Sequence, residues 1–203
     1  MVSIPTLERW RSRLPHWEVD GHWHFVTIRC QGSLPVEAKI KLQEIHQALE
    51  SIDPQCDGFR LLQRRYFLMS EKYLDMGSGF APFEHPRACK LCLDALEQMQ
   101  AEGWLVGEAT IMPNHIHLLI LRHASEYSLK QILTRFKGRS SRWINKELAR
   151  TGRAWQHDWF DRWMRHEGEL DKVVAYIRNN PVKAQLVSKW DDYRWRISSQ
   201  WDS

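Results

Sequence analysis

Two histidines that stand one residue apart, His115 and His117, are the residues of this chain best suited to hold a metal ion. They lie in the apolar run TIMPNHIHLLIL (Thr110–Leu121), directly after a proline, and this run is typical of a β-strand. Residues i and i+2 of a strand point to the same face, so both imidazoles project together. Neutral imidazoles bind several divalent metals. The alternative is a pair of surface histidines, or of core histidines with satisfied hydrogen bonds.

A second pair with the same spacing, His22 and His24, falls in the first predicted strand, so spacing alone does not identify a metal site. A catalytic metal needs a further ligand and a reacting group nearby. The last predicted helix supplies two candidates, since Tyr176 lies roughly 110° from the centre of its apolar stripe and Asn180 follows at i+4. A boundary tyrosine and an asparagine that ends a helix are the alternative.

Cys89 and Cys92 form a C-x-x-C motif, the other arrangement in the chain with metal-ligand spacing. The motif lies in the middle of a predicted helix, and a structural zinc site would require a second such pair, which the four cysteines do not supply. We therefore expect both residues to be small buried side chains of that helix.

Hydrophobic periodicity and Gly and Pro signals place these residues on strands and helices. Strands are expected at 22–30, 104–112 and 115–121, a short strand or ordered loop at 153–165, and helices at 35–51, 61–77, 86–101, 128–149 and 168–180. Pro113-Asn114 joins two of the strands as a hairpin, and Pro181 is expected to stop the last helix. Strands separated by helices predict an α+β domain around an antiparallel sheet.

The composition fits a folded protein that is not a membrane protein. Hydrophobic residues make up 43% and charged residues 27% of 203 residues, and no apolar run approaches the roughly 20 residues of a membrane span. The first residues lack an apolar signal core, so we expect a cytoplasmic protein. The net charge is +4, and many of the 11 tryptophans stand beside arginines. That pairing suits nucleic acid, but also a tryptophan-rich core under an arginine-rich surface.

Taken together, these features resemble the REP-associated tyrosine transposases, relatives of the insertion-sequence transposases within the HUH (His-hydrophobic-His) nucleases. The resemblance spans most of the chain, in order, through LPHWEVDGHWHFVTIRCQGSLP, EKYLDMGSGFAPFEHP, IMPNHIHLLIL, SLKQILTRFKGRSSRWIN, AWQHDWFDRWMR and YIRNNPVKAQLV. The P-N-H-x-H and Y-x-x-N-N-P-V-K motifs are the most specific of these segments. The residues 36–60 look particular to this chain.

The resemblance implies a ferredoxin-like α+β sheet with packed helices, formed by one domain over 1–203, with a helical elaboration at about 35–80 and an extension after about 184. It also implies that His115 and His117 bind Mg²⁺ or Mn²⁺ and that Asn180 completes the metal site. Tyr176 would be the nucleophile that cleaves and rejoins single-stranded DNA at a hairpin through a 5′-phosphotyrosine link. We expect such a protein at the nucleoid, and both a monomer and a homodimer are compatible with the family.

Basic and aromatic residues are expected to bind the DNA. The long predicted helix contributes most of them, and the others lie beyond the tyrosine helix and near the N-terminus: Arg135, Lys137, Arg139, Arg142, Lys183, Arg9, Trp10 and Arg11. Guanidinium and ammonium groups contact phosphates, and aromatic rings stack on exposed bases. A solvated basic face is the ordinary alternative for such a run.

Two other functions are compatible with parts of this pattern. A hairpin-binding protein adopted by its host would keep the DNA contacts and lack the cleavage activity. A histidine-triad nucleotide hydrolase would need His-x-His-x-His, and Leu119 occupies its third position. The presence of every proposed reactive group favours the transposase over both.

Overall fold

The computed structural model of the protein describes residues 6–11, 14–53, 56–77 and 79–199. The strands are β1 (Thr6–Arg11), β2 (Pro15–Val19), β3 (His24–Arg29), β4 (Trp104–Met112), β5 (His115–Arg122), β6 (Phe160–Trp163) and β7 (Arg196–Ser198). The helices are α1 (Val36–Ser51), α2 (Asp57–Asp75), α3 (Pro86–Ala101), α4 (Leu129–Glu147) and α5 (Glu167–Lys183), with short 3-10 helices at Pro82–Glu84 and Trp190–Asp192.

Five strands form the central sheet in the order β6-β3-β5-β4-β7, and every neighbouring pair is antiparallel. Helix α3 lies in the segment between β3 and β4, and α4 lies between β5 and β6. This is the ferredoxin-like arrangement, with β7 added at one edge of the sheet. The predicted α+β class and antiparallel sheet are therefore confirmed. β1 and β2 form a separate two-stranded sheet.

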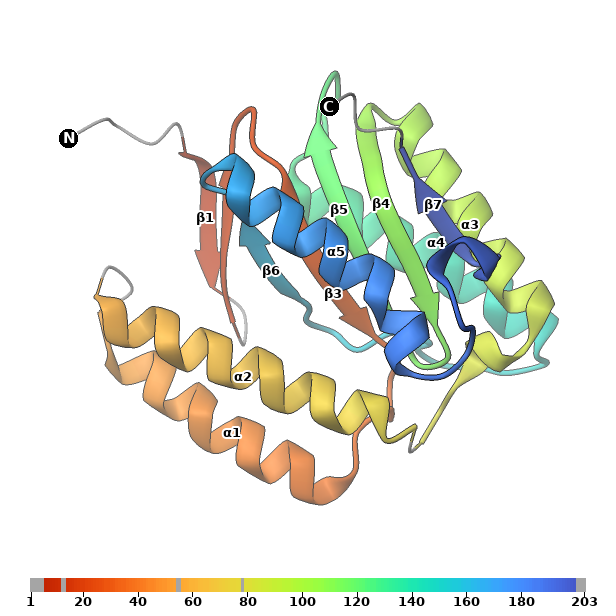
Figure 1. The fold of residues 1–203 in the computed structure, drawn as a ribbon, viewed down its shortest axis with the longest axis horizontal. Helices are drawn as coiled ribbons and strands as arrows, with labels where there is room; N and C mark the ends of the chain where they lie inside the picture. The colour runs from red at the N-terminus through yellow and green to blue at the C-terminus, as the bar shows by residue number, and fades with distance from the viewer. Residues whose placement is uncertain (1–5, 12–13, 54–55, 78, 200–203) are drawn as a thin grey trace.

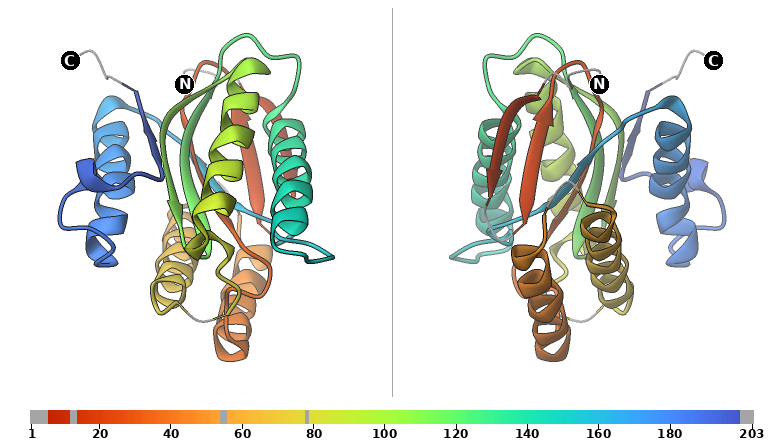
Figure 2. Two further views of the ribbon diagram at one scale, coloured as in Figure 1. Left: turned by 90° about the vertical axis from the view of Figure 1, so that its right-hand side faces the viewer. Right: turned by 90° about the vertical axis from the view of Figure 1, so that its left-hand side faces the viewer.

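The helices lie in layers on both sides of the central sheet (Figures 1 and 2). Figure 2 shows α3 and α4 on one face and α5 on the other. The helical pair α1 and α2 packs at the end of the sheet where β5 begins (Figure 1). None of the helices among the described residues is long and apolar enough to cross a membrane.

The alternation of side chains along β5 follows from this layering. Ile116, Leu118 and Ile120 point into the main core beneath α3 and α4. Leu119 faces the opposite side and packs in a second cluster with Ile177 of α5. Because the side-chain period of a strand is two, the odd-numbered residues of β5 all face α5.

Sequence patterns located the strands and helices of the central fold closely. Strand β4 and helix α3 have the predicted bounds, and β5 ends one residue later than predicted, at Arg122. Helix α4 starts after Ser128 with a capping box formed with Gln131. The strands β1 and β2 were not predicted, because LERWR and PHWEV lack a strong period-2 pattern.

The prediction that Pro181 stops the last helix was wrong, since α5 continues to Lys183. A proline inside a helix cannot donate to the carbonyl four residues earlier, which here belongs to Ile177. The hydroxyl of Thr110 on β4 donates to that carbonyl instead, at 3.2 Å. A contact from the sheet thus satisfies the acceptor that the proline leaves open.

Candidate active site

The two histidines of β5 face each other on the side of the sheet that α5 covers. His115 and His117 are buried, and their Nε2 atoms are 3.0 Å apart. The register of β3 against β5 places Thr27 opposite His117. The shared orientation that the strand period predicted is therefore present in the structure.

The Nδ1 atom of each imidazole, which points away from the other histidine, has its own hydrogen-bond partner. Nδ1 of His117 is 2.9 Å from Oγ1 of Thr27, and Nδ1 of His115 is 2.7 Å from Oδ1 of Asn114. The Asn114 amide nitrogen donates to the carbonyl of Leu74 at 3.0 Å, which fixes Oδ1 toward the histidine. Nδ1 of His115 must then be the protonated nitrogen, and its Nε2 presents a lone pair to His117. Partners of this kind orient the histidines of metal sites.

Glu71 of α2 brings a carboxylate to the same point. Its Oε2 lies 3.2 Å from Nε2 of His117, and the ligand atoms of Glu71, His115 and His117 all lie within 4.8 Å of one another. In the described parts of the chain, no other group of three or more His, Cys, Asp or Glu residues could hold a metal. The other carboxylate oxygen of Glu71, Oε1, is buried and has no hydrogen-bond partner among the described residues.

This set of atoms fits a divalent cation. Burial, with the neighbouring His117, lowers the pKa of His115 to about 3, so its imidazole is neutral at ordinary pH. Burial alone would raise the pKa of Glu71, but His117 and His115 hold it at about 2, so the carboxylate is ionised. Nε2 of His115 and the Glu71 carboxylate are acceptors on either side of His117 Nε2, and either a proton on that nitrogen or a divalent cation at this point offsets their repulsion. Two imidazoles and one carboxylate match the ligand preferences of transition ions such as Mn²⁺.

Sequence reasoning missed Glu71, although it lies in the segment EKYLDMGSGFAPFEHP that carried part of the resemblance. The available signal was its position on α2, where Ser70, Glu71 and Leu74 share the buried face. A carboxylate on the apolar face of an amphipathic helix is rarely buried unless it is paired or binds a metal.

The hydroxyl of Tyr176 on α5 donates a hydrogen bond to Oε2 of Glu71. The tyrosine ring packs edge-on against His117, with ring centroids 5.3 Å apart, and against Phe25 and Phe67. Burial and the Glu71 carboxylate raise the pKa of the Tyr176 hydroxyl well above its usual range. The phenol therefore stays protonated in this arrangement, with its oxygen beside the candidate metal ligands.

Asn180, the residue expected to complete the metal site, is buried one helical turn after Tyr176. Its amide nitrogen donates to the carbonyl of Tyr176 at 3.0 Å. Among the described residues it has no hydrogen bond to His115 or His117, whereas Oε2 of Glu71 lies 3.2 Å from Nε2 of His117.

The four basic residues predicted on α4 lie across the sheet from Tyr176, because α4 and α5 cover opposite faces (Figure 2). Arg135 and Arg139 both donate to Oε1 of Glu102 at 2.6 Å, so this carboxylate neutralises part of the basic run. Lys137 donates to the carbonyl of His157 at 2.5 Å, and Arg142 is exposed.

The remaining predicted DNA contacts lie on other elements. Lys183 at the end of α5 forms an ion pair with Asp75 at 2.6 Å. Arg9 on β1 lies over the ring of Trp17, 4.6 Å from its centroid. Trp10 is partly buried and stacks on His16, with ring centroids 5.0 Å apart. The side chain of Arg11 lies outside the described part of the structure.

The two weaker metal motifs have structural roles. Cys89 and Cys92 are fully buried on α3 without a disulfide, as expected from their position in the helix. Nε2 of His24 accepts a hydrogen bond from the Val19 amide at 3.2 Å, and burial lowers the pKa of His24 to about 4.

Comparison with known proteins found a similar solved structure and a matching family model. A solved structure of a REP-associated tyrosine transposase bound to a REP hairpin has the same fold, with a TM-score of 0.53 at 13% sequence identity. The alignment covers 92% of this chain and 82% of that one. No curated protein matches the chain.

Residues 89–180 match the family model described as "Transposase IS200 like". In this segment the chain is similar to the IS200-like transposases, in agreement with the resemblance stated from the sequence. The matched segment includes His115, His117, Tyr176 and Asn180. It leaves out the helical pair α1 and α2, and with it Glu71.

Proposed function

We propose that this protein is a metal-dependent transposase that cleaves and rejoins single-stranded DNA next to a hairpin, with Tyr176 as the nucleophile. The observation that carries the proposal is the convergence of four side chains from three elements in one buried site. His115 and His117 come from β5, Glu71 from α2, and Tyr176 from α5, and Glu71 contacts both His117 and Tyr176. The hairpin in the solved relative supports DNA of that shape as the substrate.

His115, His117 and Glu71 would hold Mg²⁺ or Mn²⁺, with Asn180 as the further ligand that the family resemblance suggests. A divalent ion bound there supplies Lewis-acid polarisation of a phosphate, worth several kcal/mol of transition-state charge. Asn114 and Thr27 would keep the two imidazoles oriented, because each forms a hydrogen bond with Nδ1 of one ring.

The covalent step balances as a phosphoryl exchange. The Tyr176 oxygen forms a bond to the scissile phosphorus while the bond from phosphorus to the 3′ oxygen breaks. The tyrosine loses its proton and the departing 3′ oxygen gains one, which leaves a 5′-phosphotyrosine and a free 3′-hydroxyl. Attack by another 3′-hydroxyl reverses the step and joins strands without an external energy source.

Incubation with a labelled hairpin oligonucleotide that carries a single-stranded flank tests this function on a denaturing gel. With MnCl₂ or MgCl₂, we expect label that migrates with the wild-type protein, no such label with Tyr176→Phe, and much less with His115→Ala or Glu71→Gln. Tyr73→Phe is the matched control, because Tyr73 is a tyrosine of α2 whose hydroxyl accepts from Lys41 and lies outside the site.

Equal labelling by Tyr176→Phe would exclude Tyr176 as the nucleophile. Tight hairpin binding without label under any metal would instead support a DNA-binding protein that lacks cleavage activity. Chelation of the metal with EDTA should abolish the label in the wild type, because the proposed ligands act through the bound ion.

A further inference from the structure

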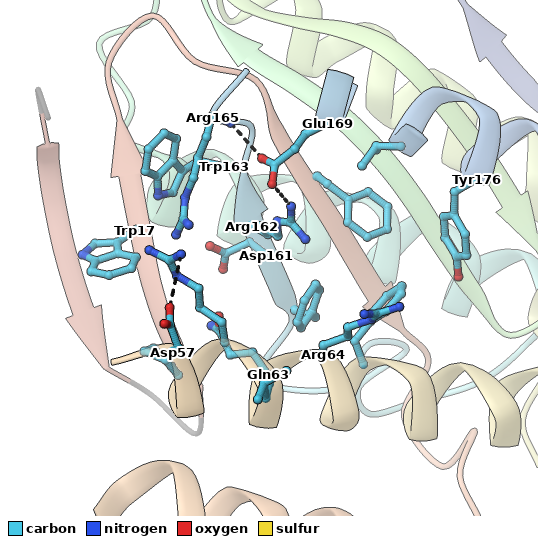
Figure 3. Close-up of a pocket in the computed structure, with 17 residues that line it drawn as sticks. Trp17, Asp57, Gln63, Arg64, Asp161, Arg162, Trp163, Arg165, Glu169 and Tyr176 are labelled. Carbon is cyan, nitrogen blue, oxygen red and sulfur yellow. Dashed lines mark hydrogen bonds and ion pairs between the residues drawn. The ribbon is translucent and has the colours of Figure 1, made fainter. Parts of the chain in front are cut away.

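A cavity of about 510 Å³ opens beside the candidate active site, between α2, α5 and the strands β2 and β6 (Figure 3). Figure 3 shows Tyr176 at one end and Trp17 at the other. The volume is within the range of about 300–1,000 Å³ that is typical of ligand pockets. Tyr176 lines the cavity, whereas the other three residues of the site do not, so the cavity begins where the catalytic cluster ends.

Aromatic rings form the part of the cavity nearest to Tyr176. The rings of Phe67 and Phe160 have centroids 4.8 Å apart, and the centroid of Phe67 is 5.6 Å from that of Tyr176. Phe25 lies 5.8 Å from Tyr176 and stacks on His117. Phe67 and Phe160 are only half-buried, so part of their ring surface faces the cavity. Such a surface suits a flat apolar group such as a nucleobase.

Three carboxylates line the cavity, and each already has a basic partner. Asp57 lies 3.7 Å from Arg60, Asp161 pairs with the buried His16, and Glu169 pairs with Arg162. These pairs leave little unbalanced negative charge in the cavity wall.

Two further arginines of the cavity, Arg64 and Arg165, supply positive charge in excess of these pairs. In the described part of the chain the Arg64 side chain has no hydrogen bond or ion pair, and it is exposed. The guanidinium of Arg165 lies over the ring of Trp163, 5.1 Å from its centroid. Burial and the positive charge of Arg60 lower the pKa of Arg165, although the Glu169 carboxylate opposes this shift. Guanidinium groups beside aromatic rings match the phosphates and bases of an unpaired strand.

We propose that this cavity binds one nucleotide of the single-stranded flank, adjacent to the phosphate that Tyr176 attacks. The base would lie against Phe67 and Phe160, and Arg64 and Arg165 would contact the backbone phosphates. A base inside a duplex has both faces stacked on its neighbours, so these rings suit an unpaired base. The position of the scissile phosphate at Tyr176 rests on the proposed function.

One wall of the cavity comes from α2, which lies outside the segment that matches the IS200-like family. Arg60, Arg64 and Phe67 all belong to this helix. The helical pair α1 and α2 would therefore contribute recognition of the flanking nucleotide, in addition to positioning Glu71.

Fluorescence anisotropy in EDTA, where no cleavage occurs, tests the proposal with a blunt hairpin and the same hairpin with a short single-stranded flank. We expect the wild type to bind the flanked hairpin about tenfold more tightly. The double variant Arg64→Ala/Arg165→Ala should lose this preference and bind the blunt hairpin as the wild type does. Its slope of log affinity against log salt should fall by about 0.7 for each phosphate contact removed. An abasic nucleotide moved along the flank should weaken binding about tenfold at one position.

The control is Arg65→Ala/Lys172→Ala, which removes the same charge from exposed residues of α2 and α5 that do not line the cavity. A double variant of the cavity that keeps the wild-type preference would overturn the proposal, as would an equal loss in the control. Equal binding of all abasic oligonucleotides would exclude base stacking in the cavity. The denaturing gel described above distinguishes this proposal from the proposed cleavage function. A preference for the flanked hairpin that depends on Arg64 and Arg165, together with no tyrosine adduct on the gel, would refute the cleavage function and leave the cavity proposal standing.

Discussion

The buried His16 offers a test of how the N-terminal strands are held against the cavity. His16 is on β2, and its ring lies between two carboxylates, Asp161 and, at 3.0 Å, Asp158. Asp158 also accepts from the amide of Leu14 at 2.9 Å. These contacts join the two-stranded sheet to the segment that contains β6, and so fix the wall formed by Trp17.

The charge of His16 makes this contact dependent on pH. Burial alone would lower the pKa of His16, but Asp161 and Asp158 raise it from 6.5 to about 9. A folded-state pKa above the unfolded value means that protonation stabilises the fold. The contribution is complete below pH 6.5 and is lost as the pH rises through about 9. The difference corresponds to about 3 kcal/mol of unfolding free energy.

Urea unfolding of the wild type and of His16→Gln between about pH 6 and pH 10 measures this contribution. We expect the wild type to be more stable at pH 6, and its advantage to shrink by about 3 kcal/mol toward pH 10. The substitution removes the titrating imidazole, so the variant should lack the trend. His123→Gln, at an exposed histidine, is the control. An advantage of the wild type that does not change with pH would refute the assignment of a protonated His16.

Four further predictions concern single residues. Asn114→Ala should weaken Mn²⁺ binding about 10- to 100-fold in isothermal titration calorimetry, because His115 loses its orienting partner; unchanged affinity would argue against that role. Gly103→Ala should destabilise the protein by more than about 1 kcal/mol, since Gly103 has φ +86° and an added Cβ would lie 2.6 Å from the backbone of Ala124. Gly138→Ala, on an exposed part of α4 with open space, should stabilise by about 0.5–1 kcal/mol in the same urea assay. Thr110→Val should lower the unfolding free energy by about 1–3 kcal/mol in that assay, because the carbonyl of Ile177 loses its donor. An unchanged unfolding free energy would contradict this account.

Local sequence patterns predicted the parts of the site whose geometry is set within one element. The period of β5 alone places His115 and His117 on one face, and the helical period places Tyr176 beside the apolar stripe of α5. Both inferences need neighbours only a few residues away. The fold class followed in the same way, from the order of strands and helices.

Contacts between distant segments could not be predicted from such patterns. Glu71 reaches the histidines only because α2 packs at the end of β5, and the sequence alone gives no distance between them. Pro181 was expected to end α5 by a local rule, and the Thr110 hydroxyl from the sheet changed the outcome. The ion pairs of Arg135 and Arg139 with Glu102 likewise arise from the packing of α4 beside the end of α3.

The most direct test of the central claim is peptide mass spectrometry of the protein after reaction with a hairpin oligonucleotide and MnCl₂. After digestion of the DNA and the protein, the peptide that contains Tyr176 should carry the mass of a 5′-linked nucleotide. The same peptide should be unmodified when the metal is chelated. A nucleotide linked to any other residue, or cleaved DNA without a protein link, would contradict the proposed mechanism.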